Sequence, residues 1–161
     1  MALFKKTWKF FWLMHNAKPL NQSSLQVETD LEAVTEVLQW FEELTSSLLP
    51  QPIGSQCQLA LVEGFTNAVR HAHHDLPQTT VIDLELKVFE QGLEMRIWDQ
   101  GSPFDWQAKL QEALCRKDSD PLEQLQQEGG RGLIFIHQLM DEVSYVRLPD
   151  QRNCLLMRKQ Y

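Results

Sequence analysis

Cysteine is scarce in this sequence of 161 residues. Cys57, Cys115 and Cys154 are widely separated, and no Cys-x-x-Cys pair is present. An odd number of separated cysteines indicates neither a disulfide framework nor a zinc site. His73 and His74 do not supply a metal site either, because adjacent residues of a helix point in different directions and no third ligand is evident. The chain therefore fits a reducing compartment, and we expect a cytoplasmic location.

Long hydrophobic runs are also missing. No apolar segment approaches the roughly 20 residues that cross a bilayer. The apolar cluster at residues 10–14 is shorter than the core of a secretory signal. We therefore expect a soluble protein without a transmembrane segment. If it is helical, the aromatic start of the chain would suit a membrane surface or a partner groove, and otherwise it is a loose tail.

Acidic residues are absent from residues 1–24, which hold four lysines. The remainder carries 11 basic against 22 acidic residues, a net charge of -11. An acidic body repels nucleic acid, so we expect no direct nucleic-acid ligand. The length suits a single well-buried core. We divide the chain into an N-terminal extension, residues 1–24, and one domain, residues 25–161.

Residues 59–72 are the stretch around which the rest is organised. At 100° per residue, apolar side chains gather on one side of a predicted helix and polar ones on the other. Glu63 and Asn67 lie one turn apart on the polar side. A carboxylate and a carboxamide so placed could hold a metal-bound phosphate group with a hydroxyl beside it. An ordinary amphipathic helix would show the same pattern, so this stretch alone leaves both interpretations open.

The remaining hydrophobic patterns predict an order of elements. Apolar residues recur every three or four positions in helices and every two in strands. We predict strands at 25–28, 81–90, 93–98, 142–147 and 154–159, and helices at 31–48, 105–117 and 133–141 around the central one. This order predicts an α/β (α+β) two-layer sandwich, in which helices stack on one face of a mixed, mainly antiparallel sheet.

Two capping boxes are predicted to start helices. Thr29 and Glu32 have the required spacing before the first helix, and Ser55 and Gln58 have it before the central helix. In such a box the hydroxyl bonds to the backbone three residues later, and the longer side chain bonds back. We therefore place both helix starts at these boxes.

Two further motifs lie at the ends of predicted elements. Asp99-Gln100-Gly101 ends the second strand of the hairpin, and the long polar connection at 102–128 follows it. Connections of that length are usually lids or disordered segments. We predict a lid, because the glycine cluster at 129–132 closes it. Glycines immediately before a helix free its N-terminal amides to face a phosphate.

Three motifs thus follow one another, and together they resemble a known family. They are Glu63-x-x-x-Asn67-Ala68, Asp99-x-Gly101 and Gly130-x-Gly132. This series resembles the Bergerat ATP-binding fold of gyrase, MutL and sensor histidine kinases. Residues 99–105 and 129–143 resemble the bacterial anti-sigma factor serine-protein kinases. The resemblance spans about 25–159, and three motifs in order are far more specific than one.

The resemblance implies a role for each motif. Asp99 would accept the adenine amino group, and Gly101 would let the backbone pass beneath the base. Asn67 would bind the Mg²⁺ that bridges the phosphates of ATP. Glu63 would act as general base or orient the attacking hydroxyl. The phosphates would lie against a backbone segment made of Gly129, Gly130, Arg131, Gly132 and Leu133.

Some assignments stay open within this family pattern. Arg131 would make a charge-assisted contact with phosphate, but a solvent-facing side chain is as good an interpretation. His71 extends the stripe of Glu63 and Asn67 and could touch the edge of the ligand, yet a structural histidine is the favoured interpretation. Related kinases often have Thr or Ser where this chain has Asn153-Cys154, which leaves the contacts to the base unassigned there.

Two functions follow from these expectations. The first is a serine/threonine-protein kinase that acts as an anti-sigma regulatory factor. It would phosphorylate an anti-sigma factor antagonist and bind a sigma factor or another target when that protein is unavailable. The second is a non-catalytic module that senses ATP or ADP and sequesters a partner.

Several considerations bear on that choice. Glu63 favours the enzyme, and a phosphate added to the partner would be repelled by an acidic body. The 24 residues before the domain are too few for the phospho-accepting hairpin of a histidine kinase. A homodimer is implied by the resemblance alone.

Overall fold

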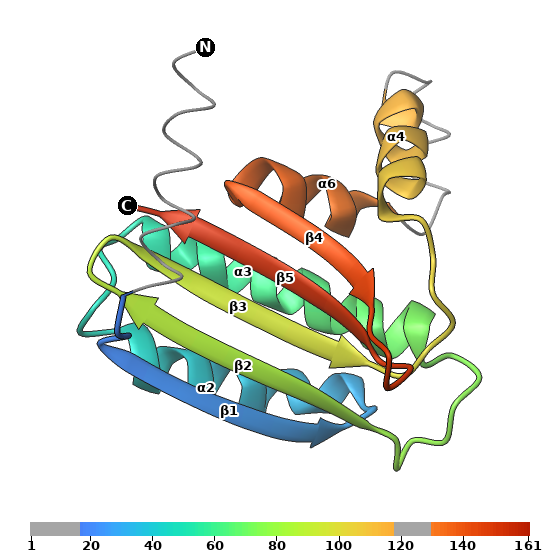
Figure 1. Ribbon diagram of the computed structural model, residues 1–161, viewed down its shortest axis with the longest axis horizontal. Coiled ribbons are helices and arrows are strands. Elements are labelled where there is room, and N and C mark those ends of the chain that lie inside the picture. The colour runs from blue at the N-terminus through green and yellow to red at the C-terminus, as the bar shows by residue number, and fades with distance from the viewer. Residues whose placement is uncertain (1–16, 118–129) are drawn as a thin grey trace.

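The structure is a computed structural model that describes residues 17–117 and 130–161 (Figure 1). Its elements are β1 (Asn21–Glu28), the 3₁₀ turn η1 (Leu31–Ala33), α2 (Val34–Thr45), α3 (Ile53–Asn67), the π-helical turn η2 (Ala68–Ala72), β2 (Val81–Phe89), β3 (Gly92–Asp99), α4 (Trp106–Lys117), α6 (Arg131–Leu139), β4 (Glu142–Arg147) and β5 (Asn153–Gln160). Among the helices of these two stretches, none has the length and apolarity to span a bilayer. Residues 118–128 of the predicted lid, together with Gly129, lie outside the described residues.

The five strands form one sheet in the order β1-β2-β3-β5-β4. Every neighbouring pair is antiparallel, so the expectation of a mixed sheet is wrong for the described strands. The hairpins β2-β3 and β4-β5 account for two of these pairings. After α4 and α6 the chain enters the edge strand β4, and β5 then returns between β4 and β3, antiparallel to both. Figure 1 shows α2, α3 and α6 on one face of the sheet, which confirms the α+β two-layer sandwich.

The core lies between that sheet and the helices. Alternate residues of the central hairpin face it and are fully buried, namely Ile82, Leu84, Leu86, Val88, Leu93, Met95 and Ile97. Each such side chain contributes about 1.5–3 kcal/mol when removed from water. A Cβ at Gly64 would lie 2.7 Å from Ile97 Cδ1 and 3.1 Å from Leu155 Cδ2. Helix α3 can therefore approach β3 and β5 closely, which brings its polar side near the end of β3.

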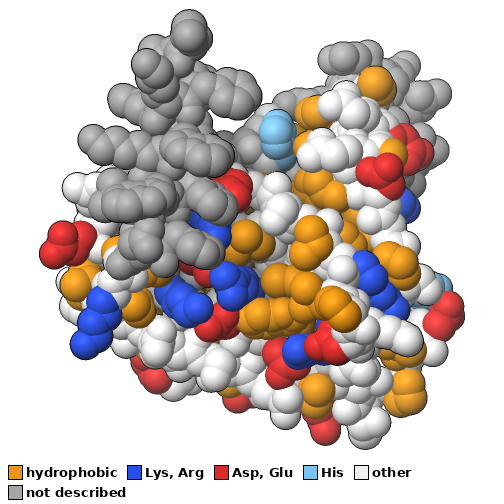
Figure 2. All heavy atoms as spheres, in the orientation of Figure 1, with side chains coloured by type: hydrophobic (Ala, Val, Ile, Leu, Met, Phe, Trp, Pro, Cys, Tyr) orange, Lys and Arg blue, Asp and Glu red, His pale blue; other side chains and the backbone are white. Residues whose placement is uncertain are grey.

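The other face of the sheet carries charged side chains beside a hydrophobic patch (Figure 2). Arg158 donates to Glu94 at 2.7 Å and to both carboxylate oxygens of Glu142 at 3.0 Å. Arg96 also pairs with Glu94, at 2.7 Å. Arg158 and Glu94 are only 5% and 6% exposed, so breaking this group would leave a buried charge. These ion pairs connect β3, β5 and β4, the three strands nearest the site described below.

The first helix does not start with the predicted capping box. Asp30 caps it, because its carboxylate accepts a hydrogen bond from the backbone of Glu32 at 2.9 Å. The Thr29 hydroxyl is engaged elsewhere, donating to the Thr80 carbonyl at 2.6 Å. The pattern identified the helix but assigned the cap to the wrong residue, because Thr29 makes a long-range contact that sequence spacing does not reveal.

The start of α3 also differs from its prediction. The helix begins at Ile53, directly after Pro52, and no side chain caps it. The Ser55 hydroxyl donates to the Gln51 side chain at 2.8 Å instead of bonding forward to Gln58. Proline favours the first positions of a helix because its φ is already near the helical value. The predicted capping box is therefore wrong here too.

Helix α3 continues into the π-helical turn η2 without a break. The backbone N–H of His73 donates to the Ala68 carbonyl at 2.9 Å, a bond that spans five residues and ends the turn. Periodicity predicted a helix through Ala72 but could not distinguish the wider turn. Such single turns often lie at functional sites. Here the turn carries His71 and Ala72 to the rim of a cavity.

Candidate functional site

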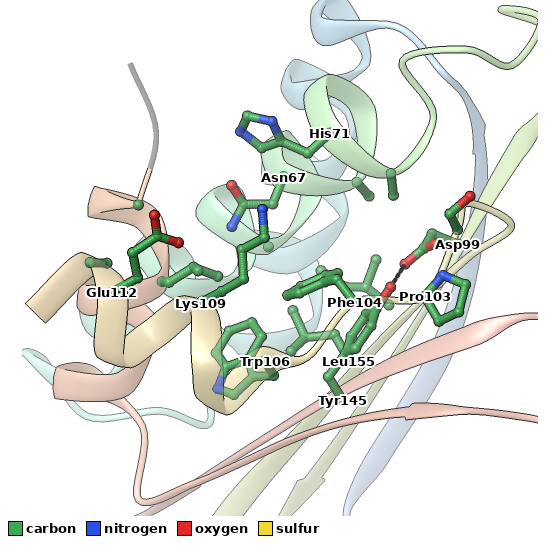
Figure 3. A pocket seen from close by; sticks show the side chains of 18 residues that line it. Asn67, His71, Asp99, Pro103, Phe104, Trp106, Lys109, Glu112, Tyr145 and Leu155 are labelled. Atoms are coloured by element: carbon green, nitrogen blue, oxygen red, sulfur yellow. Dashed lines mark hydrogen bonds between the residues drawn. The ribbon is translucent and has the colours of Figure 1, made fainter. Parts of the chain in front are cut away.

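A cavity of about 420 Å³ lies between the end of α3, helices α4 and α6, and the ends of the central strands (Figure 3). Residues from all of these elements line it, including Asn67, His71, Asp99, Phe104, Lys109, Gly130, Leu133 and Tyr145. Four of the predicted site residues therefore line the same cavity, although they are spread over 67 sequence positions. They are Asn67, Asp99, Gly130 and Leu133. The fold thus brings the three sequence motifs to the same place.

Beside Asn67 at one end of the cavity, the first turn of α6 lies against the polar side of α3, although Glu63 and Gly132 are not themselves among the lining residues. A Cβ at Gly132 would be 2.6 Å from Glu63 Oε2, 3.3 Å from Asn67 Nδ2 and 3.4 Å from Asn67 Oδ1. Glycine therefore leaves the Glu63 carboxylate in its place, because any side chain here would displace it. Glu63 and Asn67 thus lie next to the N-terminus of α6, which carries a partial positive charge.

The Asn67 side chain has capacity for a ligand. Its Nδ2 is buried and has no hydrogen-bond partner among the residues that the structure describes. A buried amide without a partner costs about 1–3 kcal/mol, so this group is suited to gain a contact on binding. A 180° turn of the amide would put its oxygen where the unpartnered nitrogen now lies, and carboxamide oxygens are ligands that Mg²⁺ accepts. The donor set therefore fits a magnesium ion held jointly by Asn67 and phosphate oxygens.

No denser metal site competes with that arrangement in the described part of the chain. Within residues 17–117 and 130–161, no three His, Cys, Asp or Glu side chains are grouped to hold an ion. Mg²⁺ typically takes one or two protein ligands and completes its shell with water and substrate phosphates. A single protein oxygen is in keeping with that habit.

The start of α6 has the geometry of an anion site. Gly130 has φ of 95°, a left-handed conformation that favours glycine, and this lets the chain turn into the helix. Gly130 and Leu133 line the cavity, and Leu133 is buried. The Arg131 side chain is exposed and does not line it. The backbone of this turn, more than the arginine, therefore faces the cavity.

At the other end of the cavity, Asp99 is 4% exposed and hydrogen-bonded on both oxygens. Oδ1 accepts from the Gly101 backbone at 2.9 Å and from Asn153 Nδ2 at 2.7 Å. Oδ2 accepts from the Tyr145 hydroxyl at 3.1 Å, the dashed contact in Figure 3. An ionised carboxylate has about four acceptor positions, so one remains for a ligand donor. Burial and Asp99 raise the pKa of Tyr145, which keeps the phenol a donor.

The backbone at Gly101 is also held by hydrogen bonds, like the Asp99 carboxylate. Its carbonyl accepts from Arg147 at 2.8 Å and from Asn153 at 3.0 Å. A Cβ at Gly101 would lie 2.1 Å from the Ala72 carbonyl oxygen, which no side chain could tolerate. The close neighbour that demands glycine is therefore the π-helical turn, and Gly101 does not itself line the cavity.

Several lining residues were not identified from the sequence. Phe104 and Trp106 pack beside Tyr145, with ring centroids 4.4 Å and 6.4 Å from its ring. Lys109 comes from α4, and in Figure 3 its side chain extends toward Asn67. The aromatic pair around Asp105 was a visible signal. Its partner Tyr145 lies about 40 positions later, and no sequence spacing connects them.

The structure also gives the positions of His71 and Asn153, two residues that the sequence left without a clear role. His71 is exposed and lines the cavity near Asn67, so it adjoins the site without being held in the core. Asn153 occupies the position noted as a departure from related kinases, and it is fully buried against Asp99. The departure therefore supplies a donor to the same carboxylate.

The sequence is similar to a known family and to several characterised proteins. The family model described as the histidine kinase-like ATPase domain matches residues 27–159. The serine-protein kinase RsbW of Oceanobacillus iheyensis is 34% identical over 104 residues, covering 65% of this chain and 63% of the relative. That of Bacillus velezensis is 41% identical over 86 residues, covering 53% and 52%. The chain thus matches between about half and just under two thirds of the length of these relatives.

A solved structure shares the fold. A chain in the crystal structure of the SiaB-SiaC complex from Pseudomonas aeruginosa superposes with a TM-score of 0.60, covering 96% of this chain and 97% of that chain. At 14% identity, this likeness concerns the fold alone. The family match covers most of the residues that the structure describes, from the end of β1 to β5. Its span includes all three motifs and the cavity they form, and the chain belongs to the histidine kinase-like ATPase family.

Proposed function

We propose that this chain is an ATP-dependent serine/threonine-protein kinase that acts as an anti-sigma regulatory factor and phosphorylates an anti-sigma factor antagonist. The name of the matched relatives, serine-protein kinase, supports the reaction type. The observation that carries the proposal is the meeting of Glu63, Asn67 and Gly132, of which Asn67 lines the same cavity as Asp99.

Each end of the cavity would bind a different part of ATP. Asp99 would accept the adenine amino group through the acceptor position that its three protein donors leave open. Phe104 and Tyr145 would lie beside the base. The backbone at Gly130 and Leu133 would face the phosphates, and Lys109 would add a positive charge there.

The residues at the phosphate end would promote transfer. Bound Mg²⁺, held by Asn67, would neutralise the charge of the phosphate oxygens. Glu63 would take the proton of the serine or threonine hydroxyl, or orient that hydroxyl toward the γ-phosphate. The hydroxyl oxygen would bond to phosphorus as the bond to the bridging oxygen breaks, and ADP would leave. Gly132 keeps Glu63 at this place by leaving room for its carboxylate.

Partners and location belong to the same proposal. The acidic body would repel a partner that has gained a phosphate, which would release the antagonist and leave this chain to bind a sigma factor or another target. A homodimer and a cytoplasmic location are proposed as well. All three thiols are free, with Cys115 exposed on α4 and Cys57 and Cys154 buried, which suits a reducing compartment. Burial raises the pKa of Cys57 to about 12 and that of Cys154 to about 11.

The test is transfer of labelled phosphate from ATP to a candidate antagonist protein. We expect Glu63→Gln to lower the transfer rate about 10²–10⁴-fold, because the change removes a general base but keeps the shape of the side chain. ADP affinity, measured by calorimetry, is expected to change by less than about threefold. Glu36→Gln is the matched control, since this carboxylate is exposed on α2 away from the cavity.

The outcomes separate the two functions considered. Transfer by Glu63→Gln at the wild-type rate contradicts the role of Glu63. Tight ADP binding by the wild type without transfer to any antagonist tested supports the nucleotide-sensing module instead.

A further inference from the structure

His73 directly follows the π-helical turn and is 1% exposed. It does not line the cavity, and the proposed mechanism does not use it. Its ring nevertheless touches two segments that are distant in sequence. Nδ1 lies 2.7 Å from Thr29 Oγ1, after β1, and Nε2 lies 2.8 Å from the backbone nitrogen of Gln100, after β3. The imidazole therefore connects three parts of the chain beside the Asp99 end of the cavity.

The partners fix which ring nitrogen carries the proton. The Thr29 hydroxyl has one hydrogen, and it donates this to the Thr80 carbonyl at 2.6 Å. Thr29 Oγ1 must therefore accept from Nδ1–H of His73. The Gln100 N–H can only donate, so Nε2 must be an unprotonated acceptor. Both contacts can be made only by the neutral ring with its hydrogen on Nδ1.

The backbone amide that donates to His73 belongs to Gln100, in the middle of the Asp99–Gly101 turn. Gln100 is flanked by Asp99, which faces the cavity, and by Gly101, which packs against the Ala72 carbonyl. Holding the Gln100 amide therefore fixes the Asp99 carboxylate relative to the π-helical turn that carries His71 and Ala72. This contact couples the two walls of the cavity at one point.

We propose that His73 is a positioning residue whose neutral imidazole holds the Asp99–Gly101 turn for nucleotide binding, and that its protonation releases this turn and weakens binding. A proton on Nε2 would face the Gln100 N–H, so two donors would point at each other. The proposal rests on the proposed nucleotide site at Asp99.

The surroundings of His73 set the direction of the pH dependence. Burial lowers the pKa of His73 from its ordinary value of 6.5, and the charge of Asp99 opposes this only in part. Thr29 and Thr80 face the ring from their own segments as neutral groups. On its own segment, the charged neighbour Asp75 pairs with exposed His74 at 2.7 Å. The affinity for nucleotide should therefore be constant above pH 6.5 and fall as the pH drops below that value.

The same shift affects folding in the same direction. The unfolded chain takes up a proton near pH 6.5, before the folded chain does. The contribution of neutral His73 to stability is thus fully present above that pH and is lost as the pH falls. Binding must therefore be measured where circular dichroism shows the chain to be folded.

The experiment is calorimetric titration with ADP between about pH 8 and about pH 5.5, the range in which histidine changes charge. We expect the wild-type affinity to fall about tenfold more than that of His73→Gln across this range. Glutamine offers an acceptor oxygen at a similar reach and does not titrate, so protonation of ADP itself cancels in the comparison. His73→Phe, which lacks any acceptor, is expected to bind weakly at every pH. His74→Gln is the control and should keep the wild-type slope.

A second measurement applies to the wild type alone. The nitrogen chemical shifts of the His73 ring should show a protonated Nδ1 and an unprotonated Nε2 at neutral pH, and the Gln100 amide resonance should follow the titration of the ring. Equal pH slopes in the wild type and His73→Gln contradict this inference alone, as does a proton on Nε2 at neutral pH. A wild type that binds no ADP at pH 8 contradicts the proposed function, and this inference with it.

Discussion

The two ends of the cavity are built in opposite ways. At the Asp99 end, the carboxylate and the Gly101 carbonyl together receive five hydrogen bonds from the protein, and their donors come from β4, β5 and the turn itself. At the Glu63 end, the buried Asn67 Nδ2 has no partner within the described part of the chain, and a helix N-terminus lies against this residue. One end is already held in place by hydrogen bonds within the protein, and the other has a buried polar group that a ligand would satisfy.

This difference indicates that one end of the cavity serves recognition and the other serves chemistry. A site that is already hydrogen-bonded loses little entropy on binding and can select one base by shape and donor pattern. A site with unpaired groups gains most when phosphate and metal arrive. We infer that the Asp99 end sets which nucleotide binds and that the Glu63 end responds to its phosphates. Two glycines, one at each end, allow a direct comparison.

The largest effect is expected from Gly101→Ala, which breaks the completed end. The new Cβ would lie 2.1 Å from a backbone oxygen of Ala72, and neither backbone can move without losing other hydrogen bonds. We expect the free energy of unfolding to fall by about 3 kcal/mol in urea denaturation, with loss of ADP binding. The matched control is Gly54→Ala, where the nearest atoms are 3.7 Å and 3.9 Å away and stability should stay within about 1 kcal/mol of wild type. Equal stabilities for the two variants would refute the packing argument.

Asp99→Asn should separate binding from folding at the same end. The asparagine oxygen can still accept from Gly101 and Asn153, and the Tyr145 hydroxyl can rotate to accept from the new amide nitrogen. Stability should therefore fall by no more than about 1 kcal/mol. ADP affinity is expected to fall about 100-fold by calorimetry, because an amide donor would face the adenine amino group. Asp150→Asn, at an exposed turn, serves as control, and unchanged ADP affinity in Asp99→Asn would remove the adenine assignment.

Gly132→Ala is the smallest of these perturbations and tests the open end. Its Cβ would meet the end of the flexible Glu63 side chain at 2.6 Å, so the carboxylate can move aside while the backbone stays in place. We expect stability to change by less than about 0.5 kcal/mol. The rate of phosphate transfer should drop about tenfold, because Glu63 would be displaced from its position. A transfer rate equal to that of the wild type would show that the position of Glu63 is not critical.

The sequence was sufficient for features that repeat locally. The four-residue spacing of Glu63 and Asn67 on a helix with an apolar opposite side predicted both their common face and the buried residues behind them. Alternation along 81–98 predicted the hairpin that ends at Asp99. The glycines before α6 predicted the turn that leads into this helix, where Gly130 has a left-handed conformation. In each case the information lies within one element.

The sequence was insufficient where contacts join distant elements. Tyr145 and Asn153 reach Asp99 from 46 and 54 positions away, and alternation in β4 and β5 does not reveal the register that places them there. Thr29 matched a helix cap but is held by Thr80 and His73, because a nearby carbonyl and ring compete for its hydroxyl. The π-helical turn has the same apolar spacing as an ordinary helix, so its extra residue was not detectable.

The distribution of thiols gives this chain a built-in place for an optical probe. A maleimide dye needs an accessible thiolate, and burial raises the pKa of Cys57 and Cys154 to about 12 and about 11. Cys115 is exposed and lies on α4, the helix that also carries Lys109 and Trp106 into the cavity wall. Labelling the native sequence should therefore attach fluorophore mainly at one position, where its emission can follow how α4 responds when nucleotide arrives.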